Sequence, residues 1–356
     1  MRADRWSLAD VARMRLLSQR LVDPLASPTE VVRHLTCTQG QDYPGSSVSI
    51  ALRTTSRRLQ DVRDAYDSGT IVRSWPMRGT LFVVPAEDLG WMLGLTSERV
   101  RRETTRRREQ LGLGEAVLDR AESVALEVLR GGGLTRAELL RAWEAAGHET
   151  DGGRGYHSIF HLALRGLLCQ GPTTGTEQRL VLTQEWISTA RRREGEEAVA
   201  EWFVRYARSH GPVPVADFLW WTKLLKRDVA PVLDAARDTL EVLLVDGVEH
   251  WVDPAVVQRY GQQRRRTAAH LLLPGFDELV LGYGDRRAVL TQDEEAQVVP
   301  GGNGVFRGTV VRAGRAVGTW KRPRRAGDVV DVTPFGAGLP GPVERALPRL
   351  SAALPS

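Results

Sequence analysis

The amino-acid sequence predicts an α+β fold in which groups of helices alternate with short β-hairpins and a strand-rich region follows. Two observations predict this fold. At three places before residue 269, amphipathic helical stretches are followed by two apolar runs that turn residues join. From His270 onward the apolar runs are short and are interrupted by glycine and proline, which is typical of strands joined by tight turns.

The first predicted unit, residues 1–112, contains several helices and then a hairpin. Ser7 is suited to cap the first helix, and Pro28 is suited to begin the second. Pro76 to Gly79 has the composition of a turn. The expected elements are helices over 7–22, 28–36, 46–53 and 57–67, strands over 70–75 and 79–84, and a helix over 86–110 that ends in an arginine run.

Residues 113–194 and 195–268 repeat this order of helices and hairpin. Thr135 and Glu138 form a capping-box pattern, and residues 156–168 resemble a recognition helix. In the second unit we expect helices over 115–130, 135–147 and 156–168 and strands over 168–172 and 180–182. In the third we expect helices over 196–209, 211–221 and 228–238 and strands over 240–245 and 250–252.

Helices followed by a two-stranded hairpin are typical of a winged helix-turn-helix, which places a helix in one DNA groove and the hairpin near a neighbouring groove or backbone. The sequence therefore predicts three tandem winged helix-turn-helix units. Residues 269–356 predict a small C-terminal β-barrel-like domain. Its expected elements are strands over 271–274, 287–290, 304–311 and 316–321 and a closing helix over 341–354.

The composition is that of an ordinary globular chain with a basic balance. The net charge is +5, and all but three of the 49 basic residues are arginine. Arginine is well shaped to hold phosphate, but the codon preference of a GC-rich genome gives the same excess. No apolar run approaches the roughly 18–20 residues of a membrane span, and the N-terminus lacks the apolar core of a signal peptide. We therefore expect a cytoplasmic, nucleoid-associated protein.

Several kinds of catalytic site are disfavoured by the sequence. The two cysteines are too few for a disulfide framework or a zinc site of cysteines. His157 and His161 share a helix face, but no third ligand is evident, so we expect no metal and no cofactor. A Gly-x-Ser-x-Gly elbow is absent from the sequence. Asp42, Asp277 and Glu278 leave a glycoside-type pair of carboxylates open.

The most unusual stretch is Gln39-Gly40-Gln41-Asp42-Tyr43-Pro44, between two predicted helices. Two neutral amides flank a glycine, and a carboxylate and an aromatic ring follow directly. Such amides often cap helix ends or bind the backbone. The same residues can also orient a water molecule at a reactive centre, since an amide oxygen accepts hydrogen bonds.

This stretch resembles the Gln-x-Gln motif of the AlkZ-like bacterial DNA glycosylases, a winged-helix family. The resemblance extends over nearly the whole chain. Residues 75–81 resemble the first wing of that family, residues 273–278 and 281–286 resemble the start of its C-terminal β domain, and residues 318–320 match a later strand. Two positions depart from the family pattern: Gly40 replaces a larger apolar residue, and Phe82 stands where many members have histidine.

The resemblance implies a monofunctional DNA glycosylase that hydrolyses the N-glycosidic bond of N7-alkylated purines, including bulky adducts and some interstrand crosslinks. Such an enzyme would serve DNA repair or self-resistance to a genotoxin. Gln39 and Gln41 would be catalytic, with Asp42, Tyr43 and Asp277 near the reacting atoms. We expect a monomer that binds double-stranded DNA through Arg73, Arg78, Arg154, Arg286 and Lys321. The alternative is a non-catalytic winged-helix regulator that binds a specific operator.

Overall fold

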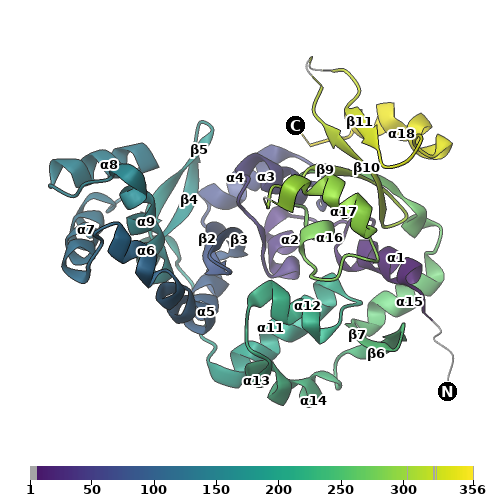
Figure 1. Cartoon of the computed structure of the whole chain (residues 1–356), viewed down its shortest axis with the longest axis horizontal. Helices are drawn as coiled ribbons and strands as arrows, with labels where there is room; N and C mark the ends of the chain where they lie inside the picture. The colour runs from purple at the N-terminus through teal and green to yellow at the C-terminus, as the bar shows by residue number, and fades with distance from the viewer. Residues whose placement is uncertain (1–5, 303, 324, 326, 356) are drawn as a thin grey trace. The chain divides into compact units, whose positions relative to one another are not determined.

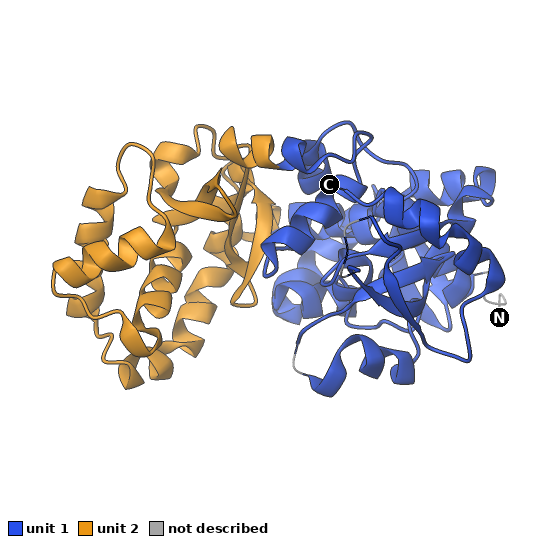
Figure 2. Cartoon of the chain, turned by 90° about the horizontal axis from the view of Figure 1, so that it is seen from above, with its two compact units in different colours: residues 1–62, 199–356 blue, residues 63–198 orange. Residues whose placement is uncertain are grey.

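The computed structural model describes residues 6–302, 304–323, 325 and 327–355 and has a mixed α/β architecture (Figure 1). The chain forms two compact units (Figure 2). Unit 1 combines residues 1–62 with 199–356, and unit 2 is the continuous segment 63–198. The four predicted segments do not coincide with these units, because unit 1 is built from both ends of the chain. Their finer boundaries stay a prediction.

Unit 1 begins with helices that frame a very short strand. Ser7 caps α1 through a capping box with Asp10, as its sequence position predicts. The elements of the N-terminal part are α1 (Leu8–Ser18), α2 (Pro28–Leu35), β1 (Thr38–Gln39), α3 (Tyr43–Leu52) and α4 (Leu59–Asp67), which reaches into unit 2. Unit 1 resumes at residue 199, inside helix α11 (Gly195–His210). The elements that follow are α12 (Val215–Thr222), α13 (Lys226–Val229), α14 (Leu233–Ala236), β6 (Glu241–Val245), β7 (Val248–Val252) and α15 (Pro254–Gln262).

The C-terminal region of unit 1 carries an open sheet with the strand order β11-β10-β9-β8. All its pairings are antiparallel. The expected barrel is therefore wrong: β8 and β11 are edges, and four strands are too few to close around a core. The elements are β8 (His270–Leu273), α16 (Glu278–Leu281), α17 (Gln292–Val298), β9 (Gly308–Arg312), β10 (Arg315–Lys321), β11 (Asp331–Pro334) and α18 (Gly341–Ala352).

Unit 2 contains two hairpins whose strands lie in the order β3-β2-β4-β5. Its core is apolar and includes the buried side chains of Trp75, Trp143 and Phe160. The elements are β2 (Ile71–Met77), β3 (Thr80–Pro85), α5 (Leu89–Glu103), α6 (Thr105–Gln110), α7 (Glu115–Val128), α8 (Arg136–Ala145), α9 (Arg154–Leu164), β4 (Leu168–Thr174), β5 (Glu177–Leu182) and α10 (Thr183–Trp186). The hairpins predicted at 70–84 and 168–182 are confirmed.

Three predicted elements differ in the structure. The helix over 86–110 is interrupted at Thr104, whose hydroxyl binds the carbonyl of Val100 at 2.9 Å. The helix over 228–238 is split because Pro231 has no N–H to donate. The expected strand over 287–290 is a turn, in which the N–H groups of Val289 and Leu290 both donate to the carbonyl of Arg286 at 2.8 Å. Its consecutive apolar side chains all enter the core, so it lacks the alternation of a half-buried strand.

The core of unit 1 joins the two ends of the chain beneath α3 and α16. Leu16 and Leu52 pack in one cluster with Leu279, Val289 and Val311. Burying such side chains contributes about 1.5–3 kcal/mol each, so this cluster fixes the N-terminal helices against the C-terminal sheet. No helix among the described residues is long and apolar enough to cross a membrane.

Candidate active site

The Gln39 to Gln41 stretch connects strand β1 to the start of helix α3. Helix α2 ends at Leu35, and Thr36 adopts φ 72° and ψ −51°. Few residues with a β-branched side chain occupy that region, so the chain makes a strained, sharp turn here. Strand β1 follows, and its residue Gln39 is buried, with only 5% of the residue exposed.

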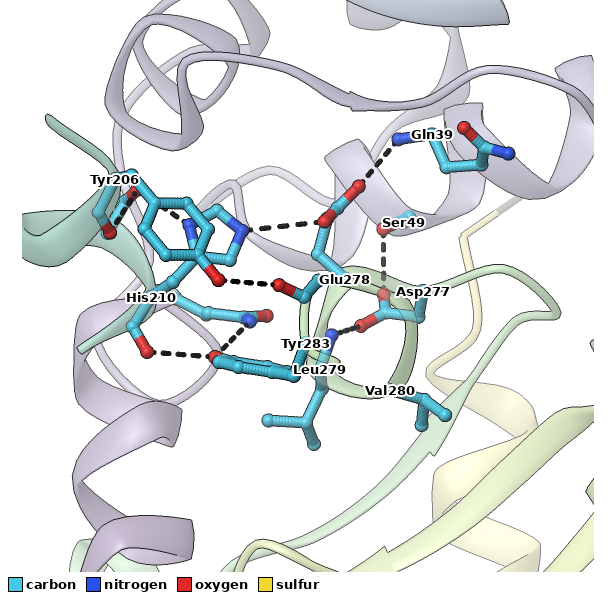
Figure 3. Close-up of polar contacts among 12 residues, drawn as sticks. Gln39, Ser49, Tyr206, His210, Asp277, Glu278, Leu279, Val280 and Tyr283 are labelled. Carbon is cyan, nitrogen blue, oxygen red and sulfur yellow. Dashed lines mark hydrogen bonds and ion pairs between the residues drawn. The ribbon is translucent and has the colours of Figure 1, made fainter. Parts of the chain in front are cut away.

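Gln39 is held by its backbone rather than by its side chain. Its N–H donates to Oε1 of Glu278 at 2.7 Å. The side chain points away from Glu278 (Figure 3). Its Oε1 is buried and has no hydrogen-bond partner among the described residues. A buried amide oxygen without a partner costs about 1–3 kcal/mol, and functional sites are a common place for such atoms.

The residues after Gln39 leave the interior and begin α3. Gln41 is exposed, whereas Asp42 and Tyr43 are partly buried. Asp42 occupies the N-cap position of α3, but its side chain makes no capping hydrogen bond to that helix. The Tyr43 carbonyl accepts the hydroxyls of Ser46 and Ser47, each at 2.9 Å. The two glutamines therefore lie in different environments, one inside the protein and one at its surface.

The contacts of Glu278 are the part of the site that the sequence predicts least. The sequence suggested it only as half of a carboxylate pair, whereas the structure binds it to the backbone of Gln39, 239 residues away. It is fully buried, and its Oε2 lies 3.4 Å from Nε2 of His210. Burial lowers the pKa of His210, although the hydrogen bond to Glu278 opposes that shift. No local pattern marks either residue, since both contacts join distant segments.

Asp277 is engaged in a buried ion pair. Its two oxygens lie 2.8 and 2.9 Å from the guanidinium of Arg53, and it also accepts the Ser49 hydroxyl at 2.7 Å and the Leu279 N–H at 3.0 Å. Burial alone would raise the pKa of Asp277, but Arg53 and the other donors hold it below its ordinary value. Each oxygen already accepts two hydrogen bonds, so this carboxylate is not available as a general acid or base. The structure favours a supporting role for it beneath the site.

A chain of buried hydrogen bonds continues from Arg53 to His210. Arg53 donates to the side-chain oxygen of Gln19 at 2.7 Å, and Gln19 donates to the Tyr283 hydroxyl at 2.8 Å. That hydroxyl donates to the carbonyl of His210 at 2.9 Å. The chain closes through Glu278, so the support of Gln39 is one connected network. Networks of this kind are rigid when every member is satisfied.

Two of the predicted DNA contacts lie in unit 1 and differ in exposure. The Arg286 side chain is 12% exposed; it donates to the Val280 carbonyl at 2.9 Å and pairs with Glu295. These contacts favour a packing role, and its contact with DNA stays a prediction. The Lys321 side chain is 79% exposed, and its Nζ lies 3.9 Å from a carboxylate oxygen of Asp331. It lines a cavity of about 460 Å³ together with Trp320.

The other three predicted DNA contacts lie in unit 2, and all are partly buried. Arg73 on β2 donates to the side-chain oxygen of Gln178 at 2.6 Å. Arg78 occupies the turn between β2 and β3 with φ 59°, which is uncommon for a residue other than glycine. Arg154 begins α9 and donates to the carbonyls of Leu111 and Glu149. Their contact with DNA also stays a prediction.

The Arg53 and Asp277 pair gives a stability prediction. Replacing Arg53 by methionine leaves a buried carboxylate without its cation, so we expect Arg53→Met to lower the free energy of unfolding by about 3–5 kcal/mol. The measurement is urea denaturation at neutral pH. Arg58 is a matched control, because its side chain is 67% exposed and lies 3.6 Å from Asp61. Arg58→Met should change stability by less than about 1 kcal/mol. Equal effects of the two substitutions would contradict the assigned role of the ion pair.

Proteins of similar sequence and structure identify the family of this chain. Residues 32–353 match the model of the family described as DNA glycosylase AlkZ-like. A curated relative, the interstrand DNA cross-link repair glycosylase of Streptomyces sahachiroi, is 26% identical over an alignment of 341 residues. The alignment covers 90% of this chain and 88% of the relative. The solved structure of Streptomyces sahachiroi DNA glycosylase AlkZ has the same fold, with a TM-score of 0.80, 23% identity and 98% of each chain covered. These similarities favour a catalytic protein over the non-catalytic regulator. The chain belongs to the AlkZ-like family of DNA glycosylases.

Proposed function

We propose that this DNA glycosylase is monofunctional and hydrolyses the N-glycosidic bond of N7-alkylated purines in double-stranded DNA. The observation that carries the proposal is Gln39, whose amide oxygen is buried without a partner among the described residues while its backbone is held by Glu278. Such an oxygen can accept a hydrogen bond from a water molecule. The name of the curated relative supports interstrand crosslinks as one substrate class.

The chemistry of the lesion explains how neutral amides can suffice. An N7-alkylated purine already carries a positive charge, so its base departs without protonation by the enzyme. The bond between C1′ and N9 breaks, and its electron pair neutralises the base. The oxygen of a water molecule forms the new bond to C1′, and the water proton passes to solvent. The protein must place this water and tolerate the positive charge that develops on the sugar.

We assign the positioning of this water to Gln39 and Gln41. Gln39 is buried, so its amide is a hydrogen-bond acceptor in fixed surroundings. Gln41 is exposed, so we propose that DNA can approach it. We assign electrostatic support to Asp42, at the start of α3, and packing near the lesion to the partly buried Tyr43. An amide is a weak base, so the reaction is expected to fail on bases that are not activated.

The small number of lysines supports a monofunctional reaction. A lyase step needs an amine that forms a Schiff base with the sugar. Lysine occurs in the chain only at positions 223, 226 and 321, and none of these is near Gln39 in the sequence. The proposed product is therefore an intact strand that contains an abasic site.

Bulky lesions and crosslinks call for a site that is open to the duplex. A base tied to the opposite strand cannot rotate fully into a closed pocket. The exposed Gln41 and the partly buried Asp42 are compatible with approach from a groove. Three winged helix-turn-helix units would supply the surrounding DNA contacts, and we propose that the chain acts as a monomer in the cytoplasm, at the nucleoid.

A panel of four duplexes tests the proposal. We expect abasic sites, scored by strand cleavage with alkali, in duplexes that contain N7-methylguanine, a bulky N7 adduct or an N7 crosslink. Uracil in the same sequence should remain, because its release requires activation that the amides do not supply. Without alkali the strands should stay intact. Release of uracil at a rate similar to that of N7-methylguanine, or trapping of the protein on DNA by borohydride, would contradict the proposal.

The exposed Lys321 gives a prediction on DNA affinity. If its ammonium contacts a phosphate, Lys321→Gln should weaken binding of any duplex by about 3- to 10-fold and lower the slope of log affinity against log salt by about 1. Lys226→Gln is the matched control, because Lys226 is also exposed and its substitution removes the same charge. The measurement is the titration of each protein with duplex DNA at several salt concentrations. An unchanged salt slope in Lys321→Gln would remove this residue from the DNA interface.

A further inference from the structure

Glu278 has a property that the proposed reaction does not yet use, which is its charge. Its side chain is completely buried, and one of its oxygens accepts the N–H of Gln39 at 2.7 Å. We propose that Glu278 is a positioning residue for base release, and that its negative charge is required in addition to its hydrogen bond to Gln39. This inference rests on the glycosylase reaction proposed above.

The buried carboxylates of unit 1 differ in their partners. Asp277 is paired with Arg53 at 2.8 Å, and Asp217 lies 3.7 Å from Arg15. Glu278 differs from both. Among the described residues, its carboxylate contacts a histidine, His210, rather than an arginine. Arg53 and Arg15 are thus each paired with another carboxylate.

His210 is the histidine that contacts Glu278. The imidazole is fully buried, stacks on the Tyr206 ring with centroids 4.6 Å apart, and has Nδ1 2.9 Å from the Ser209 hydroxyl. Burial lowers the pKa of His210 below its ordinary value, against the opposing effect of Glu278. A neutral imidazole can present one N–H to the carboxylate but brings no positive charge. In the proposed state the imidazole is neutral, and the negative charge of Glu278 acts on the Gln39 backbone through the 2.7 Å hydrogen bond.

Such a charge has two consequences for the reaction. A hydrogen bond to an ionised acceptor is shorter and stronger than one between neutral groups, so it fixes the direction in which the Gln39 side chain leaves the strand. The charge also attracts positive charge through an interior of low dielectric. As the C1′–N9 bond breaks, the positive charge of the base moves onto the sugar. The proposal therefore requires Glu278 to act on the sugar more strongly than on the base, so that its charge favours the transition state over bound substrate.

The variant Glu278→Gln separates charge from hydrogen bonding. Glutamine has the same size, and its oxygen can still accept the Gln39 N–H. We expect the single-turnover rate on an N7-methylguanine duplex to fall by about 10- to 100-fold, while the affinity for that duplex changes by less than about twofold. A purely structural role would lower stability and affinity together. A rate equal to that of the wild-type chain would overturn the requirement for charge.

Asp217→Asn is the matched control. It makes the same change from carboxylate to amide at a buried residue that accepts the backbone N–H groups of Gly284 and Asp285 at 3.0 and 2.9 Å. The rate per folded molecule should remain within about twofold of wild type. A loss in this control equal to the loss in Glu278→Gln would show a general effect of unit 1, and would overturn the specific role of Glu278.

A second variant keeps the test decisive if Glu278→Gln does not fold. Glu278→Asp retains the charge with a shorter side chain, and we expect a folded protein with at least about one tenth of the wild-type rate. A folded Glu278→Asp with a loss above about 100-fold would overturn the inference. Failure of the proposed function looks different, since the wild-type chain itself would then release no N7-methylguanine.

Discussion

The buried ion pair between Arg53 and Asp277 determines where the candidate catalytic residues lie. Arg53 ends helix α3, which begins directly after the Gln39 to Gln41 stretch. Asp277 caps helix α16, whose first residue is Glu278. One contact between residues 224 positions apart therefore holds both the segment that carries the amides and the carboxylate that binds their backbone. A buried pair of this kind offers little net stability relative to apolar residues, and its value here is geometric.

The distribution of charge in unit 1 fits a reaction that needs neither a strong base nor a general acid. Asp217 and Asp277 each lie against an arginine, whereas Glu278 lies against the imidazole of His210. The leaving group of an N7-alkylated nucleotide is already activated. Catalysis can then consist of holding a water molecule and stabilising a cationic sugar, which are tasks for fixed dipoles and a fixed negative charge.

Local features of the fold could be predicted from the sequence, and distant contacts could not. The hairpins near Gly79 and Gly247, the N-cap at Ser7 and the capping box at Thr135 depend on neighbouring residues, which the sequence displays directly. The open C-terminal sheet was missed, because closure depends on strand number and on how edges meet in space. The division into two units was missed because unit 1 joins both chain ends.

The candidate site shows the same limit. The amide pair at Gln39 and Gln41 could be found from composition and from resemblance. Neither of these gives the contact to Glu278 or the burial that lowers the pKa of His210. Asp277 was expected near the reacting atoms, which stays a prediction, and the sequence does not give its buried pair with Arg53. The run Asp277-Glu278 was visible in the sequence, whereas the division of labour between these neighbours depends on which partners the fold brings to each.

The central claim is that the Gln39 amide positions the attacking water, and the most direct measurement is base release by Gln39→Ala. This substitution removes the amide and keeps the backbone N–H that Glu278 binds. The account predicts that the single-turnover release of N7-methylguanine from a duplex falls by about 100- to 1000-fold, while the affinity for that duplex is retained. An undiminished rate in a folded Gln39→Ala protein would contradict the account.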